Sequence, residues 1–306
     1  MKIEANAKIP VSGFAIVKNG QSLGYPYLES LKSLAPLVDE IVIAHGDSTD
    51  ETLLSLKNLA KELPIPLRII DSPWNSQNLK KGLELSRQTN IALGSCQHEI
   101  CFYLQSDEVL HDEETEIIRR DLQRFASDPK VSALAFHWVH FYGSTDYVVH
   151  SRKWYRREIR VVKKSAGLQS VGDAQGFRQF SGHSVTKPDT ALSQARVLHY
   201  GWTRPPDMMV KKTNALDSLW GHQKLENLPR PEETIYSMQF GIQKFTLAHP
   251  KVMDSYLSKV SHKDPFEGQR IKKDFQYYRM RFSDFLEKKT GLRIGEFKNY
   301  RKLYRY

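Results

Sequence analysis

Two acidic side chains directly follow an apolar run near the middle of the chain. Residues 100–104 are continuously apolar and partly aromatic, which is typical of a buried strand in a parallel sheet. Asp107 and Glu108 come just after this run. Open α/β sheets bind ligands at the carboxyl ends of their strands, where two carboxylates could hold a divalent cation against phosphate oxygens. An ordinary acidic loop after a core strand is the alternative, and this stretch alone does not choose between them.

Elements that could position these acids precede them in a regular alternation. Short apolar runs end at polar turns, and each run is followed by a segment in which leucines recur at helical spacing. This order predicts βαβ units and a right-handed, doubly wound parallel sheet. The predicted strands are residues 12–17, 40–44, 67–70 and 100–104, and the predicted helices are 27–37, 53–59 and 77–93.

The alternation changes after residue 110. Carboxylates at the start of 112–126 favour a helix, since they complement its dipole, and two long aromatic strands are predicted at 131–142 and 154–162. Residues 165–189 are rich in Gly, Ser and Gln, which indicates binding loops. We divide the chain into a sheet domain, 1–205, and a basic, mainly helical region, 206–306, with helices predicted at 254–260, 266–285 and 296–306.

Composition indicates a globular protein with anionic partners. The 306 residues are 40% hydrophobic and 26% charged, with a net charge of +10. Cys96 and Cys101 are too close in sequence to suggest a disulfide framework, so a reducing cytoplasmic setting is expected. The start shows no secretory signal, and no run is long enough to cross a bilayer. The expectation is a soluble or peripheral cytoplasmic protein.

The polar residues at the four strand ends carry a resemblance. Asn19 follows the first strand, Ser48-Thr49-Asp50 the second, Trp74-Asn75 the third and Gln105-Ser106-Asp107-Glu108 the fourth. In this order they resemble the family 2 glycosyltransferases with a GT-A fold. The subgroup most resembled is the lipopolysaccharide core β-glucosyltransferases, because residues 90–93, Asn-Ile-Ala-Leu, precede 105–108 at matching spacing. The resemblance covers about residues 10–205.

The resemblance implies a fold and a reaction. The fold would be a Rossmann-like mixed α/β sheet flanked by helices, with a helical C-terminal extension. The reaction would move a sugar from a UDP-sugar or another nucleotide-sugar, with inversion, to a hydroxyl on a glycan or a lipid-linked acceptor. It needs a base for the acceptor hydroxyl and Mn²⁺ or Mg²⁺ to neutralise the departing diphosphate.

The resemblance also implies a metal site. Asp107 matches the family's metal-binding aspartate, and His199 stands where GT-A enzymes often supply a metal-ligating histidine, although a structural histidine is the alternative. Gln105 replaces the first aspartate of the Asp-x-Asp motif, so it could bind ribose but brings no charge to the metal. Glu108 would support the metal or be a charge approaching the next helix.

Further roles follow by position. Asp47 would contact uracil or ribose, or cap a helix, and the nucleotide-binding residues implied are Val17, Lys18, Asn19, Asp47, Asn90, Gln105 and Ser106. Asp173 is the candidate base, with a Gly-flanked turn as the alternative, and Glu158 is held in reserve. Trp202 could stack on a sugar, while Arg204, Lys211 and Lys212 could bind the diphosphate or form a solvated face.

Two other functions remain open. Gln105 and the altered Gly46-Asp47 segment allow an inactive nucleotide-sugar-binding protein, and the basic C-terminal helices allow a nucleic-acid-binding module, although no nucleic-acid motif occurs and none is expected. The basic, aromatic C-terminal region could lie on an anionic membrane, pack on the catalytic domain or form a dimer. Packing is favoured, because the aromatic residues are numerous enough to be core.

Overall fold

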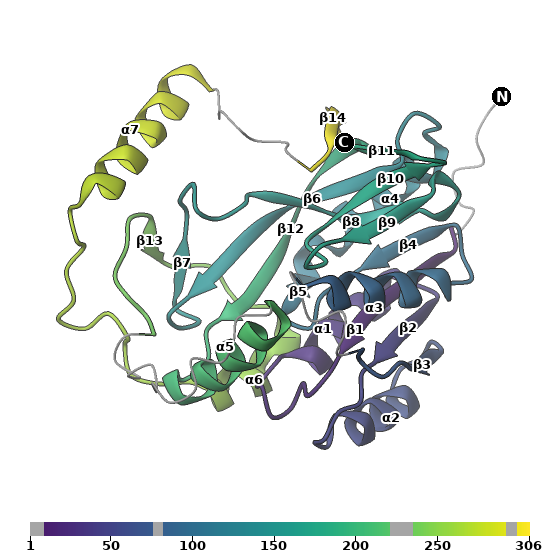
Figure 1. Ribbon diagram of the computed structural model, residues 1–306, viewed down its shortest axis with the longest axis horizontal. Helices are drawn as coiled ribbons and strands as arrows, with labels where there is room; N and C mark the ends of the chain where they lie inside the picture. Colours follow the sequence, from purple (N-terminus) through teal and green to yellow (C-terminus); the bar gives the residue numbers. More distant parts are fainter. Residues whose placement is uncertain (1–8, 76–81, 221–234, 292–298) are drawn as a thin grey trace.

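Four parallel strands form one end of the main sheet (Figure 1). The computed structural model describes residues 9–75, 82–220, 235–291 and 299–306. Neighbouring strands lie in the order β4-β1-β2-β3, and every pair among them is parallel. The predicted doubly wound arrangement is therefore confirmed. The strands are β1 (Val11–Val17), β2 (Glu40–His45), β3 (Leu67–Asp71) and β4 (Ile100–Tyr103).

Alternate side chains of these strands enter two separate cores. Ile43 and Phe102 join the core that contains α1, α2 and α4, whereas Val42 and Tyr103 join the core on the α3 side. Because successive side chains of a strand point to opposite faces, a sheet covered on both faces needs apolar residues at every position. This explains the continuous apolar runs in the sequence. The helices are α1 (Tyr27–Leu34), α2 (Thr52–Glu62), α3 (Leu83–Gly94) and α4 (Thr115–Ser127).

The sheet becomes mixed beyond β4. β8 is antiparallel to β4 and to β6, while the long strand β12 is parallel to β6 and antiparallel to β5. In this register His199 of β12 lies opposite Glu108 of β5 and His140 of β6. The pairing thus brings a residue from late in the chain beside the end of β4. These strands are β5 (Glu108–Leu110), β6 (Ala133–Tyr142), β7 (Tyr147–Val149), β8 (Arg157–Lys163) and β12 (Asp189–Trp202).

Residues 165–189 are more regular than the sequence indicates. They form a small antiparallel sheet of β9 (Leu168–Val171), β10 (Gly176–Ser181) and β11 (Ser184–Thr186). The Asn90 amide of α3 pairs with the backbone of β9, since it donates to the Ser170 carbonyl and accepts from the Ser170 N–H. Asn90 therefore fixes β9 to α3, and the turn between β9 and β10, residues 172–175, lies within the stretch predicted to form binding loops.

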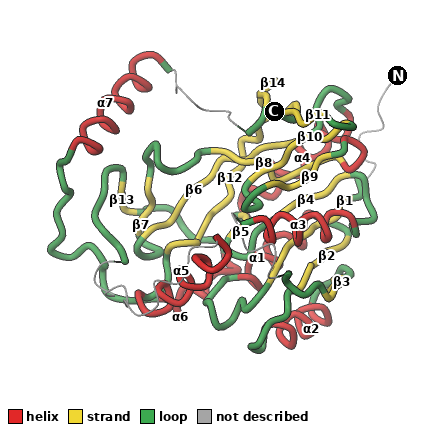
Figure 2. The backbone as a smooth tube through the Cα atoms, in the orientation of Figure 1, coloured by secondary structure: helices red, strands yellow, loops and turns green. Residues whose placement is uncertain are grey.

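The C-terminal region combines helices with strands (Figure 2). β13 (Ile242–Lys244) pairs with β7, and β14 (Arg301–Arg305) lies parallel to β12. A helix over 296–306 was predicted, which is wrong for β14; residues 296–298 lie outside the described residues. The division at residue 205 stays a prediction, although β13 and β14 return to the main sheet. The helices are α5 (Pro206–Trp220), α6 (Asp254–Val260) and α7 (Phe275–Thr290).

Shorter features complete the description. Both cysteines are buried and unpaired. None of the helices in the described ranges is long and apolar enough to cross a membrane. Short 3-10 helices span Ala35–Leu37, Asp112–Glu114, Lys164–Ala166 and Lys251–Met253.

Candidate active site

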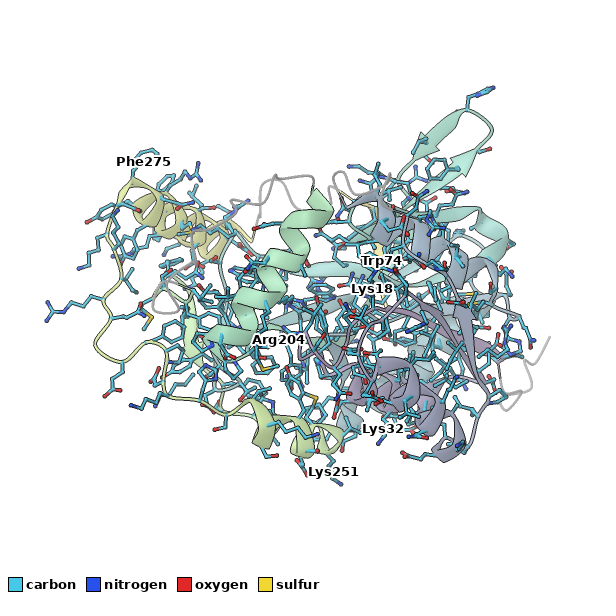
Figure 3. All side chains as sticks on the ribbon, turned by 60° about the horizontal axis from the view of Figure 1, so that its bottom comes forward. Lys18, Lys32, Trp74, Arg204, Lys251 and Phe275 are labelled. Carbon is cyan, nitrogen blue, oxygen red and sulfur yellow. The ribbon has the colours of Figure 1, made fainter. Side chains whose placement is uncertain are left out.

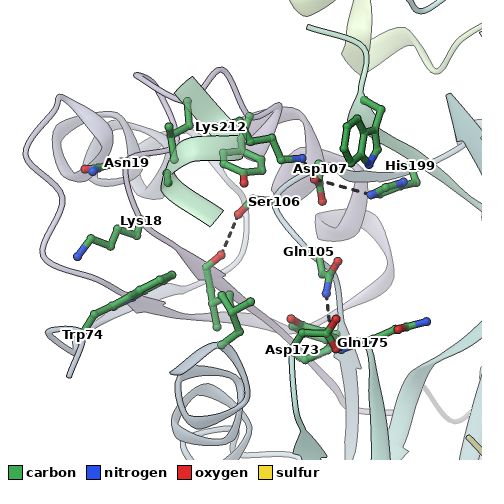
Figure 4. A pocket seen from close by; sticks show the side chains of 18 of the residues that line it. Lys18, Asn19, Trp74, Gln105, Ser106, Asp107, Asp173, Gln175, His199 and Lys212 are labelled. Carbon is green, nitrogen blue, oxygen red and sulfur yellow. Dashed lines mark hydrogen bonds and ion pairs between the residues drawn. The ribbon is translucent and has the colours of Figure 1, made fainter. Parts of the chain in front are cut away.

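A pocket of about 700 Å³ opens at the carboxyl ends of β1, β2 and β4 (Figure 4). The turn between β9 and β10, the end of β12 and the helix α5 close its sides. This is the edge of the sheet where the sequence predicted a ligand. Its polar and aromatic lining comprises Lys18, Asn19, Tyr25, Asp47, Trp74, Tyr103, Gln105, Ser106, Asp107, Tyr155, Asp173, Gln175, His199, Trp202 and Lys212.

Asp107 is a buried carboxylate paired with a lysine from α5. The Lys212 ammonium donates to Oδ2 of Asp107 at 3.2 Å and to the Gly201 carbonyl at 2.6 Å. Burial acts to raise the pKa of Asp107, but the charges of Lys212 and Arg204 outweigh it and hold that pKa well below the usual range. Asp107 is therefore ionised at neutral pH. Burial lowers the pKa of Lys212 to about 8, so this ammonium is still largely charged at neutral pH.

A chain of hydrogen bonds fixes the tautomer of His199. Nε2 of His140 lies 2.7 Å from the Tyr155 carbonyl, so this nitrogen carries the hydrogen. Nδ1 of His140 then accepts from Nδ1 of His199 at 3.1 Å. Nε2 of His199 is left with a free lone pair, which faces Oδ2 of Asp107 at 3.7 Å. Burial lowers the pKa of His199 to about 4, which keeps the imidazole neutral.

Asp107 and His199 fit a divalent cation. Two electron-pair donors face each other, and an imidazole fixed through its other nitrogen is the usual form of a metal-binding histidine. Gly201 keeps the space clear, because a Cβ there would lie 2.4 Å from Nε2 of His199 and 3.1 Å from Oδ2 of Asp107. Within the described ranges, no three His, Cys, Asp or Glu side chains are grouped to hold a metal ion. A cation at this pair would need further ligands from a bound phosphate.

Glu108 lies behind the pocket in a fully buried ion pair. Its two carboxylate oxygens accept from Nε and Nη2 of Arg160 at 2.7 and 2.6 Å. One of them also accepts from the backbone N–H of Gln105 at 3.1 Å. The predicted charge approaching a helix is wrong, since Glu108 begins β5. Glu108 instead fixes the backbone that presents Gln105 and Asp107.

We expect Glu108→Ala to lower the free energy of unfolding by about 3 to 5 kcal/mol, because it leaves the Arg160 guanidinium buried without a counter-charge. Urea denaturation at pH 7 measures the change. Glu116→Ala is the matched control: it breaks an ion pair with Arg119 in which the glutamate side chain is 81% exposed. The control should leave the unfolding midpoint almost unchanged. Equal losses of unfolding free energy in the two variants would show that the buried ion pair stabilises the fold no more than an exposed one.

The far end of the pocket combines charge with an aromatic ring. Oδ1 of Asp47 accepts from the Lys18 ammonium at 2.5 Å and from the Trp74 N–H at 3.2 Å. The same ammonium lies 5.0 Å from the centre of the Trp74 ring. The alternative of a helix cap for Asp47 is therefore wrong, since its carboxylate joins the loops after β1, β2 and β3. This end presents a flat ring and fixed charges.

Asn19 and Ser106 position the loops around them. The Asn19 side chain accepts from the Thr49 N–H at 2.8 Å, and its own N–H donates to Ser48 at 2.9 Å. Ser106 donates to the Ile16 carbonyl at 2.8 Å, which ties the end of β4 to β1. Both residues line the pocket.

The turn between β9 and β10 brings Asp173 to the pocket. The Gln105 side chain donates to the Ala174 carbonyl at 3.2 Å, so the end of β4 holds this turn in place. Ala174 has a φ of 61°, a left-handed conformation that costs free energy in a residue with a side chain. Strain of this kind is maintained where the surroundings fix the geometry. The turn therefore presents Asp173 rigidly to the pocket, which Trp202 also lines.

Comparison with protein families matches residues 17–182 to Glycosyl transferase family 2. The matched segment exceeds half of the 306 residues. This chain belongs to glycosyl transferase family 2. It is accordingly a glycosyltransferase with the GT-A fold of that family. A search of curated proteins found no match.

A search of solved structures found glycosyltransferases that match at low identity and low TM-score. S. aureus TarS matches with 15% identity and a TM-score of 0.40, covering 74% of this chain and 42% of that chain. The present chain thus spans less than half of that protein. TarS 1–349 in complex with UDP-GlcNAc matches with 15% identity and a TM-score of 0.36, covering 74% and 70%. Mannosyltransferase PcManGT from Pyrobaculum calidifontis, in complex with GDP-Man and Mn²⁺, matches with 14% identity and a TM-score of 0.41, covering 74% and 67%.

Besides Glu108 and the exposed Lys211, four residues predicted to touch ligand in this glycosyltransferase do not line the pocket. Val17 is a core side chain whose carbonyl accepts from the Gly46 N–H. Asn90 holds β9, as described above. Arg204 is buried, donates to the Gly24 and Gly201 carbonyls and lies over the Tyr25 ring. Glu158 accepts from Gln175 and Asn299, and burial raises its pKa to about 7.

Sequence reasoning missed or left undecided other residues of the site in this glycosyltransferase. Lys212 was one of three basic candidates for the diphosphate, and only the fold shows that it pairs with Asp107. Tyr25 directly follows a turn, Gln175 stands in one, and neither follows a pattern that sequence reasoning could use. His140 was not considered, because its role depends on the pairing of β6 with β12.

Proposed function

We propose that this glycosyltransferase moves a sugar, with inversion, from a UDP-sugar or another nucleotide-sugar to a hydroxyl acceptor. The observation that carries the proposal is the meeting of Asp107, His199 and Lys212 inside the 700 Å³ pocket at the carboxyl edge of the sheet. A carboxylate, a neutral imidazole with a free lone pair and an ammonium together suit a nucleoside diphosphate, which carries several negative charges.

The pocket has two ends that suit the two ends of a nucleotide-sugar. We place the base and ribose at Lys18, Asp47 and Trp74, where a flat ring and polar groups can stack and form hydrogen bonds. The diphosphate then lies towards Asp107 and Lys212. Gln105 lines the same pocket. Its predicted contact with the ribose therefore stays part of the proposal.

The leaving diphosphate needs positive charge as its bond to the sugar breaks. When bound at Asp107 and His199, Mn²⁺ or Mg²⁺ would neutralise charge on the diphosphate oxygens. The Lys212 ammonium supplies a fixed positive charge in the same place even when no metal ion is bound. Asp107 keeps the ammonium oriented, and Arg204, buried behind Tyr25, adds a further positive charge. Fixed charges in a buried site stabilise a developing anion more strongly than they would in water.

Asp173 is the proposed base for the acceptor hydroxyl. It lines the pocket on a turn that Gln105 holds, so its carboxylate has a defined position relative to the donor. Trp202, also in the lining, offers an aromatic face for a sugar ring. We propose a glycan or a lipid-linked sugar as acceptor, in keeping with the resemblance to the lipopolysaccharide core β-glucosyltransferases. The two unpaired cysteines support placing this reaction in the cytoplasm.

Turnover of nucleotide-sugars tests the proposal. The purified chain is incubated with UDP-sugars and GDP-sugars in the presence of Mn²⁺, and release of the nucleoside diphosphate is followed, with and without simple glycan acceptors. We expect slow hydrolysis with one donor and faster release with acceptor. Binding of UDP or GDP without turnover of any donor would favour the alternative of an inactive nucleotide-sugar-binding protein. No binding of either nucleotide would contradict the proposal.

We expect Lys212→Met to weaken the binding of UDP about tenfold, because a charge-assisted contact with the diphosphate is lost. Lys211→Met is the matched control, since its side chain is exposed one position earlier on α5. Calorimetric titration of UDP into both variants measures the difference. If both variants bind UDP as the unmodified chain does, the diphosphate does not lie at Lys212.

A further inference from the structure

The outer face of α7 exposes four aromatic side chains. Phe275, Tyr278, Phe282 and Phe285 are 82%, 57%, 62% and 55% exposed, and Figure 3 shows Phe275 at the outer edge of the molecule. They make up much of the large apolar surface that the described residues expose. A contiguous exposed apolar patch indicates an interaction surface. The predicted packing of the C-terminal aromatic residues is thus confirmed for the buried Tyr236, Tyr256, Phe266 and Tyr300 and wrong for these four residues of α7.

The four aromatic side chains form one stripe along the helix. Their spacing of three, four and three residues places them on a single side of an α-helix. The opposite side holds the buried Met280 and the contacts that fix α7 to the body, Arg156 with Glu287 at 2.8 Å and Arg152 with Ser283. The stripe consequently faces away from the protein in a fixed orientation.

Basic side chains flank the stripe. Residues 270–289 hold seven Lys or Arg and three Asp or Glu, which gives a net charge of +4. The acidic residues do not lie in the stripe: Asp274 caps the helix, Asp284 pairs with Lys288, and Glu287 pairs with Arg156. Arg279, Arg281 and Lys289 are exposed beside the aromatic rings. The outer face is thus aromatic along its centre and positive along its edges.

We propose that this aromatic and basic face of α7 binds the surface of an anionic lipid bilayer. A helix that lies in the headgroup region inserts an apolar stripe between lipids while Lys and Arg contact anionic headgroups, and aromatic rings favour that depth. A second copy of the chain is a poorer partner, because antiparallel or parallel pairing of this face sets Arg and Lys against their own copies. Charge complementarity therefore selects the bilayer.

The position of α7 gives this contact a consequence for the enzyme. Met280, Asp284, Glu287 and Lys288 on its inner face border a second cavity of about 270 Å³. Tyr155 borders both this cavity and the 700 Å³ pocket. A bilayer bound at the outer face of α7 would therefore have this helix between it and the second cavity, which shares Tyr155 with the pocket that we assign to the donor.

Vesicle co-sedimentation of the full chain tests the proposal. One set of vesicles is phosphatidylcholine, and the other contains about 30% phosphatidylglycerol, enough to give a negative surface potential. We expect binding to the anionic vesicles, little binding to the neutral ones, and weaker binding as salt is raised. Phe282→Ser with Phe285→Ser should lower the partition coefficient more than about tenfold.

Matched variants separate this surface from general effects. Leu54→Ser with Leu247→Ser removes two apolar side chains that are 54% and 57% exposed elsewhere and should leave vesicle binding unchanged. Titration of UDP shows that every variant is folded. The proposal is overturned if the unmodified chain ignores anionic vesicles, if both double variants bind alike, or if ultracentrifugation shows a dimer that only the Phe282 and Phe285 changes dissolve.

Discussion

Asp173→Asn should lower kcat by about a thousandfold, because a base that accepts the proton of an attacking hydroxyl contributes roughly 10²- to 10⁴-fold. The amide keeps an oxygen that can accept from the Gln175 N–H, as Oδ1 of Asp173 does at 3.4 Å, so the turn should keep its shape. The affinity for UDP should stay the same, since we place the diphosphate at Asp107 and Lys212. Steady-state kinetics together with calorimetry separate the two quantities.

Glu158→Gln is the control for this assignment. Burial raises the pKa of Glu158 to about 7, which is a suitable value for a base, but its carboxylate lies outside the pocket and contacts Gln175 and Asn299. We expect a loss below about tenfold from this variant. A base must be deprotonated, so catalysis by Glu158 would give a rate that rises with pH through about 7. Such a profile, flattened in Glu158→Gln, would move the role of base from Asp173 to Glu158.

Asp107→Asn should lower kcat/KM by about a thousandfold, since one change removes a cation ligand and the partner that orients Lys212. The amide has nearly the same shape, so the pocket should stay intact. Asp47→Asn is the matched control, because it neutralises a carboxylate of the same pocket that is 55% exposed and pairs with Lys18. The control should mainly raise KM, by about tenfold. Similar values of kcat/KM for the two variants would contradict the role of Asp107 as cation ligand and partner of Lys212.

Sequence reasoning predicted the first half of the fold well for a physical reason. The strands β1 to β4 are buried on both faces, so their composition alone marks them. β14 was missed because residues 301–305, Arg-Lys-Leu-Tyr-Arg, are mostly exposed and basic, and their strand exists only through pairing with β12. The hairpin of β9 and β10 was not predicted, because its Gly, Ser and Gln residues are typical of loops. Asn90, which is far away in sequence, holds the hairpin in place.

The site divides in the same way. Asp107 was predicted because it follows a strand whose end lies at the ligand-binding edge. The free lone pair of His199 was not predictable, since it depends on His140 and on a carbonyl that the fold brings within 2.7 Å. Arg204 and Lys212 stand eight positions apart in a basic segment, and only the packing of α5 shows that Lys212 lines the pocket while Arg204 supports Tyr25.

Calorimetric titration of UDP, with Mn²⁺ and with EDTA, into the unmodified chain and Asp107→Asn tests the central claim most directly. We predict that UDP binds the unmodified chain, at least about tenfold more tightly with Mn²⁺, and that Asp107→Asn abolishes the effect of Mn²⁺. Binding of UDP that is the same in both proteins and indifferent to Mn²⁺, or no binding of UDP or GDP under any condition, would contradict the assignment of this pocket to a nucleotide-sugar held at Asp107.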